Sequence, residues 1–454
     1  MIADTPTVVV VVVALIATGA GAAIGLFVRP SVFFALGLGA SVMSGNWERL
    51  GLPIGLDRML MLGGLGALVL GVTVSPRPPG VRKFRAVEVV MVVLAAIAIA
   101  SALVAGSLTQ PQGFYALLDR LGIVPFVAFA LADRVFGTEE DRRFLVGVMT
   151  VVGAYLAVTA VFEIVGMTAL VFPKYINDPL IGTHWGRARG PFLEAGADGL
   201  ALFECGVAAM VGVAIFRRRA ARLAGISVAA ACGLGVLLTL TRADWIAAVV
   251  GAIVGCLLHP RARRWLLPVA GVVAVAVVVA LVLIPGLATR ASDRASDQKP
   301  VWDRKNTNTA AVRIVEAHPL FGVGWQQFVP ENADYVRQAD DYPLSQVTIG
   351  VHNVFLSYAA ELGLVGGVLW LAAVGLGAAA AWKGGASMSP EWRAASMAIL
   401  VNWLVVGAFQ PLAFAFPNLC VWLWLGVAAA PTARRLRSGA RVSELEAAAT
   451  SPAT

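Results

Sequence analysis

Long apolar stretches alternate with short polar links along almost the whole chain. Each stretch is close to the ~20 residues that a helix needs to cross the hydrocarbon core of a bilayer. A helix satisfies its own backbone hydrogen bonds in lipid, and the alternating pattern of a barrel strand is missing from the sequence. We therefore predict an all-α polytopic membrane protein with about 12–13 transmembrane helices. The predicted spans cover residues 7–28, 31–45, 58–75, 86–107, 121–137, 144–172, 197–216, 222–241, 244–259, 265–288, 351–382, 393–410 and 415–431.

Composition supports a membrane environment. Hydrophobic residues make up 59% of the 454 residues and charged residues 14%, whereas soluble domains rarely exceed about half apolar residues. The net charge of +8 could suggest a nucleic-acid partner. The basic residues instead gather in short links between spans, as at 217–222 and 261–264, which is the positive-inside signature of cytoplasmic loops. We therefore predict membrane lipids, and no nucleic acid, as partners.

The same rule orients the spans. The basic links, together with the tail after residue 431, belong to the cytoplasmic side. The segments around 173–196, 241–244, 289–350 and 410–418 then lie on the opposite side. The N-terminal end stays open because Arg29 interrupts the first apolar run. An odd number of spans would place the N-terminus outside, and an even number would place it inside.

The segment 289–350 differs from the other links because it is much longer than the usual few residues. It carries several aromatic residues, among them Trp302, Trp325 and Phe328, which gives it apolar material for folding. We predict a mostly helical extracytoplasmic loop domain between the tenth and eleventh spans. The predicted division of the chain is 1–288 and 351–431 for the membrane bundle, 289–350 for the loop domain, and 432–454 for a disordered cytoplasmic tail.

Histidine is rare, and three of the four histidines fall on the predicted outer side: His184, His318 and His352. His352 opens the span that begins near residue 351, at the depth where polar chemistry meets the bilayer. One interpretation is an interfacial histidine that anchors the start of a helix. The other is a general base, since a histidine titrates near physiological pH.

Several arginines also lie at outer boundaries, where the positive-inside bias disfavours them. They are Arg187, Arg189, Arg242, Arg304 and Arg313. For Arg242 a salt bridge with Asp244 is one explanation. The functional explanation is an anion, because guanidinium groups bind phosphate bidentately and keep their charge.

No metal site is predicted, because the histidines and acidic pairs lack the short spacing of metal ligands. The four cysteines all lie in predicted spans and are interpreted as small buried residues. Gly322 and Gly324 lack the preceding strand of a nucleotide-binding loop, so we interpret them as a turn that lets the backbone pass close to another segment. We therefore predict neither a metal nor a cofactor.

Three stretches, taken in order over roughly residues 185–370, resemble the O-antigen ligase and O-antigen polymerase family of membrane glycosyltransferases. The first is Arg189-Gly190-Pro191-Phe192. The second is Thr239-Leu240-Thr241-Arg242, similar to the Thr-x-Ser-Arg turn of the family. The third runs from Arg304 through His318-Pro319-Leu320-Phe321-Gly322-Val323-Gly324-Trp325 to His352-Asn353 and Glu361-Leu362-Gly363. Thr241 stands where the family often has serine, and Asn308 stands where it usually has an aromatic residue.

The resemblance implies an all-helical bundle in the bacterial inner membrane with its active face extracytoplasmic. It implies that Arg242 and Arg304 grip the diphosphate of an undecaprenyl-linked glycan, with Arg189 as a third contact. It also implies that His352 activates a hydroxyl of a glycan, lipid or protein acceptor. Asn353, Gly322, Gly324, Arg187 and Arg313 are predicted to support this site.

Two alternatives stay open. A polymerase that joins lipid-linked repeat units would use the same donor chemistry. A transporter belongs to another class, and its site would lie near the bilayer midplane on buried charge. The charged residues within spans that could serve it are chiefly Glu163, Glu204 and Glu361.

Overall fold

The computed structural model describes residues 16–430 apart from 22, 26, 53, 75–83, 284–285, 338–342, 344–349 and 386–388. The tail predicted over 432–454 lies outside the described residues. Every regular element within the described residues is a helix and none is a strand, which confirms the all-α prediction. The helices are α2 (Pro30–Ala40), α3 (Leu56–Val74), α4 (Ala86–Val104), α5 (Pro111–Ala116), α6 (Ile123–Val135), α7 (Glu139–Val165), α8 (Ala195–Ile215), α9 (Arg219–Leu238), α10 (Arg242–Leu258), α11 (Leu266–Leu283), α12 (Leu287–Ser296), α13 (Lys299–Ala317), α14 (Phe328–Tyr335), α15 (Val354–Gly385), α16 (Pro390–Gly407) and α17 (Ala415–Ala428).

Six helical stretches in the described residues are long and apolar enough to cross a membrane, which confirms a polytopic membrane protein. They are Ala86–Val104, Pro111–Val135, Glu139–Val165, Ala195–Ile215, Arg219–Leu238 and Val354–Gly384. The other spans predicted between residues 31 and 431 also correspond to helices, namely α2, α3, α10, α11, α16 and α17. The total of about 12–13 crossings stays a prediction.

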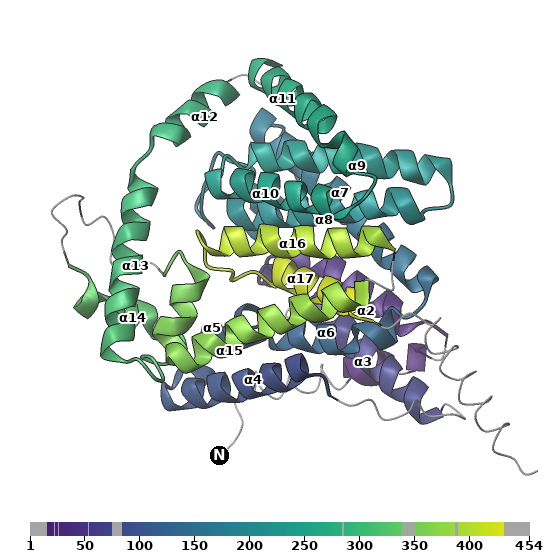
Figure 1. Ribbon diagram of the computed structural model, residues 1–454. Coiled ribbons are helices and arrows are strands. Elements are labelled where there is room, and N and C mark those ends of the chain that lie inside the picture. Colours follow the sequence, from purple (N-terminus) through teal and green to yellow (C-terminus); the bar gives the residue numbers. More distant parts are fainter. Residues whose placement is uncertain are drawn as a thin grey trace, which may run out of the picture.

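The membrane helices lie side by side, with α8 packed among α7, α9 and α16 (Figure 1). The buried face of α8 is built from glycine and alanine, including Gly196, Gly199 and Ala208, and such small residues let membrane helices approach closely. Helices α12, α13 and α14 run across one end of this bundle (Figure 1). They fall within or beside the segment 289–350, which we predict from the sequence to be a loop domain.

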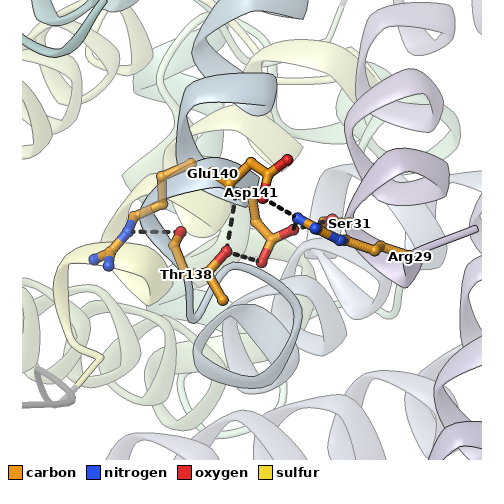
Figure 2. A network of polar contacts seen from close by, with 6 residues as sticks. Arg29, Ser31, Thr138, Glu140 and Asp141 are labelled. Atoms are coloured by element: carbon orange, nitrogen blue, oxygen red, sulfur yellow. Dashed lines mark hydrogen bonds and ion pairs between the residues drawn. The ribbon is translucent and has the colours of Figure 1, made fainter.

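The end of the bundle at which α7 begins is fixed by a polar network (Figure 2). Thr138 caps α7 by accepting a hydrogen bond from the amide of Asp141 at 3.1 Å. Ser31 donates to Asp141 at 2.6 Å, and Arg29 lies 2.8 Å from Glu140. These contacts tie the start of α2 to the start of α7. The arginine that interrupts the first apolar run therefore lies at the same end as the basic links that we predict to be cytoplasmic.

At the opposite end, α15 is broken at Gly363, whose φ of 69° lies outside the helical region. The break exposes carbonyls and amides that a continuous helix would pair internally, and the loop 318–325 pairs with them. The amides of Val323 and Gly324 donate to the carbonyls of Ala360 and Glu361, each at 3.0 Å. In return, the amide of Leu364 donates to the carbonyl of Pro319 at 2.8 Å. The loop therefore replaces the missing helical hydrogen bonds, which is how a broken membrane helix is tolerated.

Glycines make this pairing possible. Gly322 and Gly324 have φ angles of +66° and +110°, and a Cβ atom at Gly322 would overlap the carbonyl of Ala360. A Cβ atom at Gly363 would likewise overlap the carbonyl of Leu320. Both the backbone conformation and the close approach therefore require glycine. The expectation that Gly322 and Gly324 form a turn passing close to another segment is confirmed.

Helices α13 and α14 share a small core with α15. Ala310, Ile314, Phe328 and Ala360 are buried together in it. Arg313 links the two loop helices because its Nη1 donates to the carbonyl of Tyr335 at 2.9 Å. The loop helices therefore pack directly on the first turns of α15, the helix that follows His352.

Candidate functional site

His352 lies immediately before α15, in a half-buried position. Asn353 begins the helix, since its Oδ1 accepts hydrogen bonds from the amides of Phe355 at 3.0 Å and Leu356 at 3.1 Å. A side chain that caps these amides satisfies donors that the first helical turn leaves open. Asn353 therefore fixes the backbone from which His352 projects, and its supporting role at the site stays a prediction.

The surroundings of His352 favour the neutral form of its imidazole, because they lower its pKa. Burial, and then the positive charge of Arg304, lower the pKa of His352, while the Gly350 backbone and the charges of Asp303 and Glu194 act in the opposite direction. The buried Nδ1 atom has no hydrogen-bond partner among the described residues. A neutral imidazole with an open ring nitrogen can accept a proton.

Arg304 projects from α13 towards the turn that follows α16. Its Nε donates to the carbonyl of Phe409 at 3.2 Å, and its guanidinium carbon lies 5.9 Å from the centre of the Phe409 ring. Burial, and then the charge of Arg242, lower the pKa of Arg304, but a guanidinium stays charged under physiological conditions. No carboxylate of the described residues lies within salt-bridge distance of Arg304.

Arg242 is the first residue of α10 and follows a tight turn from α9. Leu240 takes a left-handed conformation, and Thr241 Oγ1 donates to the carbonyl of Thr239 at 3.1 Å. The side chain of Arg242 reaches the loop helices, because Nη2 donates to the carbonyl of Asp297 at 3.1 Å. The amino-terminal end of α10 adds its own partial positive charge here. The structure thus brings Arg242, Arg304 and His352 together from three separate helices.

Asp244 is buried behind Arg242 and holds the turn that Arg304 contacts. Its Oδ1 accepts from Gln410 Nε2 at 3.3 Å, and its Oδ2 accepts from Thr239 Oγ1 at 3.4 Å. Gly196 and Gly199 on α8 leave room for these side chains, since a Cβ at either position would overlap Gln410 or Asp244. Asp244 therefore connects the α9–α10 turn to the turn that follows α16.

Arg189 is placed differently from the other two predicted phosphate ligands. Its side chain is buried, and both Nη atoms already donate to backbone carbonyls. Nη1 lies 2.6 Å from the carbonyl of Ile181, and Nη2 lies 2.8 Å from that of Ile176 and 2.6 Å from that of Asp178. Burial lowers the pKa of Arg189. These contacts favour a structural role in holding the loop before α8, and a phosphate contact by Arg189 stays a prediction.

Arg187 and the two remaining outer histidines lie around the same end of the bundle. Arg187 is half-buried, and its Nε has no hydrogen-bond partner among the described residues. His184 Nδ1 lies 3.0 Å from Glu194, and His318 Nε2 lies 3.0 Å from the hydroxyl of Tyr335. The histidines are thus held by separate partners. Within the described residues, no three histidine, cysteine or acidic side chains gather to hold a metal ion.

Sequence reasoning missed Arg120, which lies between α5 and α6 in a short π-helical turn, Leu117–Leu121. Its Nη1 lies 3.2 Å from Glu361, its Nη2 donates to Ser357, and its guanidinium lies over the rings of Trp325 and Tyr358. The signal was a charged pair, Asp119-Arg120, at the outer border of the span predicted at 121–137. Border charges are common, so the pattern did not distinguish this one.

A cleft of about 1160 Å³ opens beside His352. Its walls come from α3 and from α5 and α6, and it continues past residues 326–330 and 411–415. Gly350 and Val351, which directly precede His352, line it as well. A cavity of this size can hold much of a lipid-sized molecule. The cleft therefore comes within one residue of His352 in the chain, whereas His352 itself lies in the field of Arg304.

Residues 226–371, from within α9 to within α15, match the family model described as O-antigen ligase. The matched segment contains Arg242, Arg304 and His352, together with the loop that pairs with the broken α15. A comparison with curated proteins gives no match.

Proposed function

We propose, from the match of residues 226–371 to the family model described as O-antigen ligase, that this chain is a membrane glycosyltransferase with an undecaprenyl-diphosphate-linked glycan as its donor. The acceptor is a hydroxyl of a glycan, lipid or protein on the extracytoplasmic face of the bacterial inner membrane. The observation that supports this best is the convergence of Arg242, Arg304 and His352 at one end of the bundle, with the pKa of His352 lowered.

In the proposed reaction the acceptor hydroxyl gives its proton to His352 while its oxygen attacks the anomeric carbon of the donor. The bond between that carbon and the diphosphate oxygen breaks, and the electron pair leaves with undecaprenyl diphosphate. Negative charge grows on the leaving oxygen, where Arg242 and Arg304 would stabilise it. Two fixed guanidinium groups supply there the positive charge that many diphosphate enzymes take from a metal ion, so the scheme uses no cofactor.

A polymerase that joins lipid-linked repeat units is the alternative within the same chemistry. It would use the same donor contacts and the same base, and would differ only in the acceptor. The lipid-linked products that accumulate without the protein separate the two.

The transporter alternative is supported less well than the glycosyltransferase proposal. The reason is the contacts that the charged residues within the spans make. Glu163 accepts hydrogen bonds from the amides of Arg189 and Gly190, at 3.2 and 3.0 Å. Glu361 is paired with Arg120 at 3.2 Å. Two of the three carboxylates considered for transport thus stabilise the loop before α8 and the start of α15, whereas transport sites need groups that can bind and release a solute.

The test is mass spectrometry of undecaprenyl-linked glycans in a strain that lacks the protein, complemented with the natural chain or with His352→Ala. Accumulation of long polymer, both without the protein and with His352→Ala, supports a ligase. Accumulation of single repeat units in the same two strains supports a polymerase. Unchanged lipid-linked glycans in both would overturn the proposed function and favour a transporter.

A further inference from the structure

The cleft next to Gly350 and Val351 is lined by both apolar and polar side chains. Its apolar lining includes Met59 and Leu62 from α3 and Val124 and Val127 from α6, and Val127 is 41% exposed. Its polar lining includes the amide side chains of Gln110, Gln112 and Gln326. This combination matches an amphiphile with an acyl chain between the helices and a polar headgroup near the base.

The balance of charged residues that line the cleft differs from that at the proposed diphosphate site. Four carboxylates line it, from Glu48, Asp57, Asp119 and Glu361, against the two guanidiniums of Arg58 and Arg120. The formal excess is therefore two negative charges.

Both guanidiniums are already matched by carboxylates. Arg58 forms an ion pair with Asp119 and lies 3.5 Å from Asp57. Arg120 lies 3.2 Å from Glu361. A phosphorylated headgroup would meet an excess of like charge here, and like charges brought together away from bulk water repel strongly. Amide side chains, such as those of Gln110, Gln112 and Gln326, instead suit the hydroxyl groups of an uncharged sugar.

We propose that this cleft binds the acceptor, and that the acceptor is a lipid with an uncharged sugar headgroup. The inference rests on the proposed function and adds the class of the second substrate. The headgroup hydroxyl reaches His352 along Gly350 and Val351, while the donor diphosphate lies on the other side of the imidazole at Arg242 and Arg304. The two substrates thus meet at His352 from opposite sides, and the cleft selects against anionic lipids by charge.

Photocrosslinking tests the occupant of the cleft. In the test protein, p-benzoylphenylalanine replaces Val127 in the full chain. In the control protein it replaces Val158, which is 50% exposed on α7 and does not line the cleft. Both proteins are placed in nanodiscs with equal amounts of diglucosyl diacylglycerol, phosphatidylglycerol and undecaprenyl diphosphate. We expect the neutral glycolipid to be captured at 127 about tenfold more than at 158, a preference of about 1.4 kcal/mol. Preferential capture of undecaprenyl diphosphate at 127 would make the cleft a donor-tail site, and equal capture of all lipids would make it ordinary lipid contact; either result overturns the proposal.

Filling the cleft separates this inference from the proposed function. Val127→Trp should lower glycan transfer by about tenfold or more and leave binding of undecaprenyl diphosphate unchanged, because only the acceptor is displaced. Val158→Trp should leave both unchanged. Normal transfer by a correctly inserted Val127→Trp protein would overturn the cleft assignment and leave the reaction standing. A natural chain that transfers no glycan, yet captures the glycolipid at 127, would overturn the reaction while the lipid site stands.

Discussion

The end of the bundle that carries His352 holds two groups of arginines with different partners. Arg58 and Arg120 lie against carboxylates, in ion pairs with Asp119 and Glu361. Arg304 instead donates to a backbone carbonyl and lies within the field of a second guanidinium, Arg242. Each arginine of the first group is paired with a carboxylate, whereas no carboxylate of the described residues lies within salt-bridge distance of Arg304.

Under the proposed function, this difference would separate the cations that hold the fold from those that bind the donor diphosphate. Removing one member of a buried ion pair leaves the other charge uncompensated, which destabilises the protein. Placing two guanidiniums close together raises the energy of the empty site, and a diphosphate that binds between them relieves it. The outer position alone, which is all that the sequence shows, does not separate the two cases.

The largest effect is expected from His352→Ala, which removes the proposed base. Transfer should fall by about 10²–10⁴-fold, the usual contribution of general acid–base catalysis. The measurement is the rate of glycan transfer by purified protein in nanodiscs. His318→Ala is the matched control, because His318 lies at the same end but contacts Tyr335, and it should retain activity. Equal losses in the two variants would remove the base assignment.

The pH profile sharpens the same assignment. The base must be neutral to accept a proton, and burial with the charge of Arg304 lowers the pKa of His352. Activity should therefore be full at neutral pH and fall as the pH drops through a pKa below the ordinary value near 6.5. Arg304→Gln removes the nearby positive charge. In the activity that this variant retains, the pH at which half of the activity is lost should therefore be higher. An unchanged midpoint would show that another group titrates.

Substitution of Arg304 should weaken donor use by less than the loss of the base. Arg304→Ala removes one of two cations at the leaving group, and we expect transfer to fall by about 10²-fold, as for the loss of one donor in an oxyanion hole. Arg304→Lys keeps the charge but lacks the planar pair of donors, so it should recover only part of the activity. The thermal unfolding midpoint should barely change in either variant. A large fall in stability would place Arg304 with the structural arginines.

Arg120→Ala should act on stability first. Glu361 would be left as an unpaired buried carboxylate, and breaking such a pair costs about 3–5 kcal/mol. The double substitution Arg120→Met with Glu361→Gln removes both charges and should recover much of this loss. Thermal unfolding of the single and double variants in detergent measures the coupling. Additive losses would mean that the pair contributes little.

The smallest effect is expected at Asn353, which caps α15 but does not touch the donor in the proposed scheme. Asn353→Ala should cost about 1 kcal/mol of stability, the usual loss at a helix N-cap. Asn353→Ser and Asn353→Asp should preserve most of it, because both keep an acceptor oxygen. Hydrogen exchange at the amides of Phe355 and Leu356 reports the cap directly. Protection that survives in Asn353→Ala would show that another group satisfies these amides.

Much of the fold follows from local pattern. Apolar length predicts the membrane helices because each span must satisfy its own backbone in lipid, and all those predicted between residues 31 and 431 are helices. The break in α15 is different, because the apolar run from Leu362 to Trp370 contains nothing that ends a helix at Gly363. The hydrogen bonds that stabilise the break come from a loop about forty positions earlier in the chain. The periodicity of apolar positions does not predict such long-range hydrogen bonds.

The proximity of the candidate site residues was easier to predict than their supports. His352, Arg242 and Arg304 stood out at outer boundaries, and the family resemblance implied their roles. The structure places the three close together, and their roles stay predictions. Arg189 shows the same sequence signal but is held by three carbonyls. Arg120 pairs with Glu361, which is 241 positions away in the chain. Tertiary packing decides whether an arginine contacts a carbonyl, a carboxylate or an open site. The local pattern of the sequence does not predict which of these it contacts.

The exchange of hydrogen bonds at Gly363 has a mechanical consequence. His352 precedes a short helical segment rather than the full length of α15, so the long transmembrane part does not fix it alone. The loop that joins this segment is anchored elsewhere by Trp325, whose amide and indole donate to Ser101 and Gly113. Tyr358 and Glu361 of the short segment are in turn bonded to Arg120. The position of His352 is therefore set by neighbouring helices α4 and α5 and by the turn that carries Arg120, and a change at any of these contacts would be felt at His352.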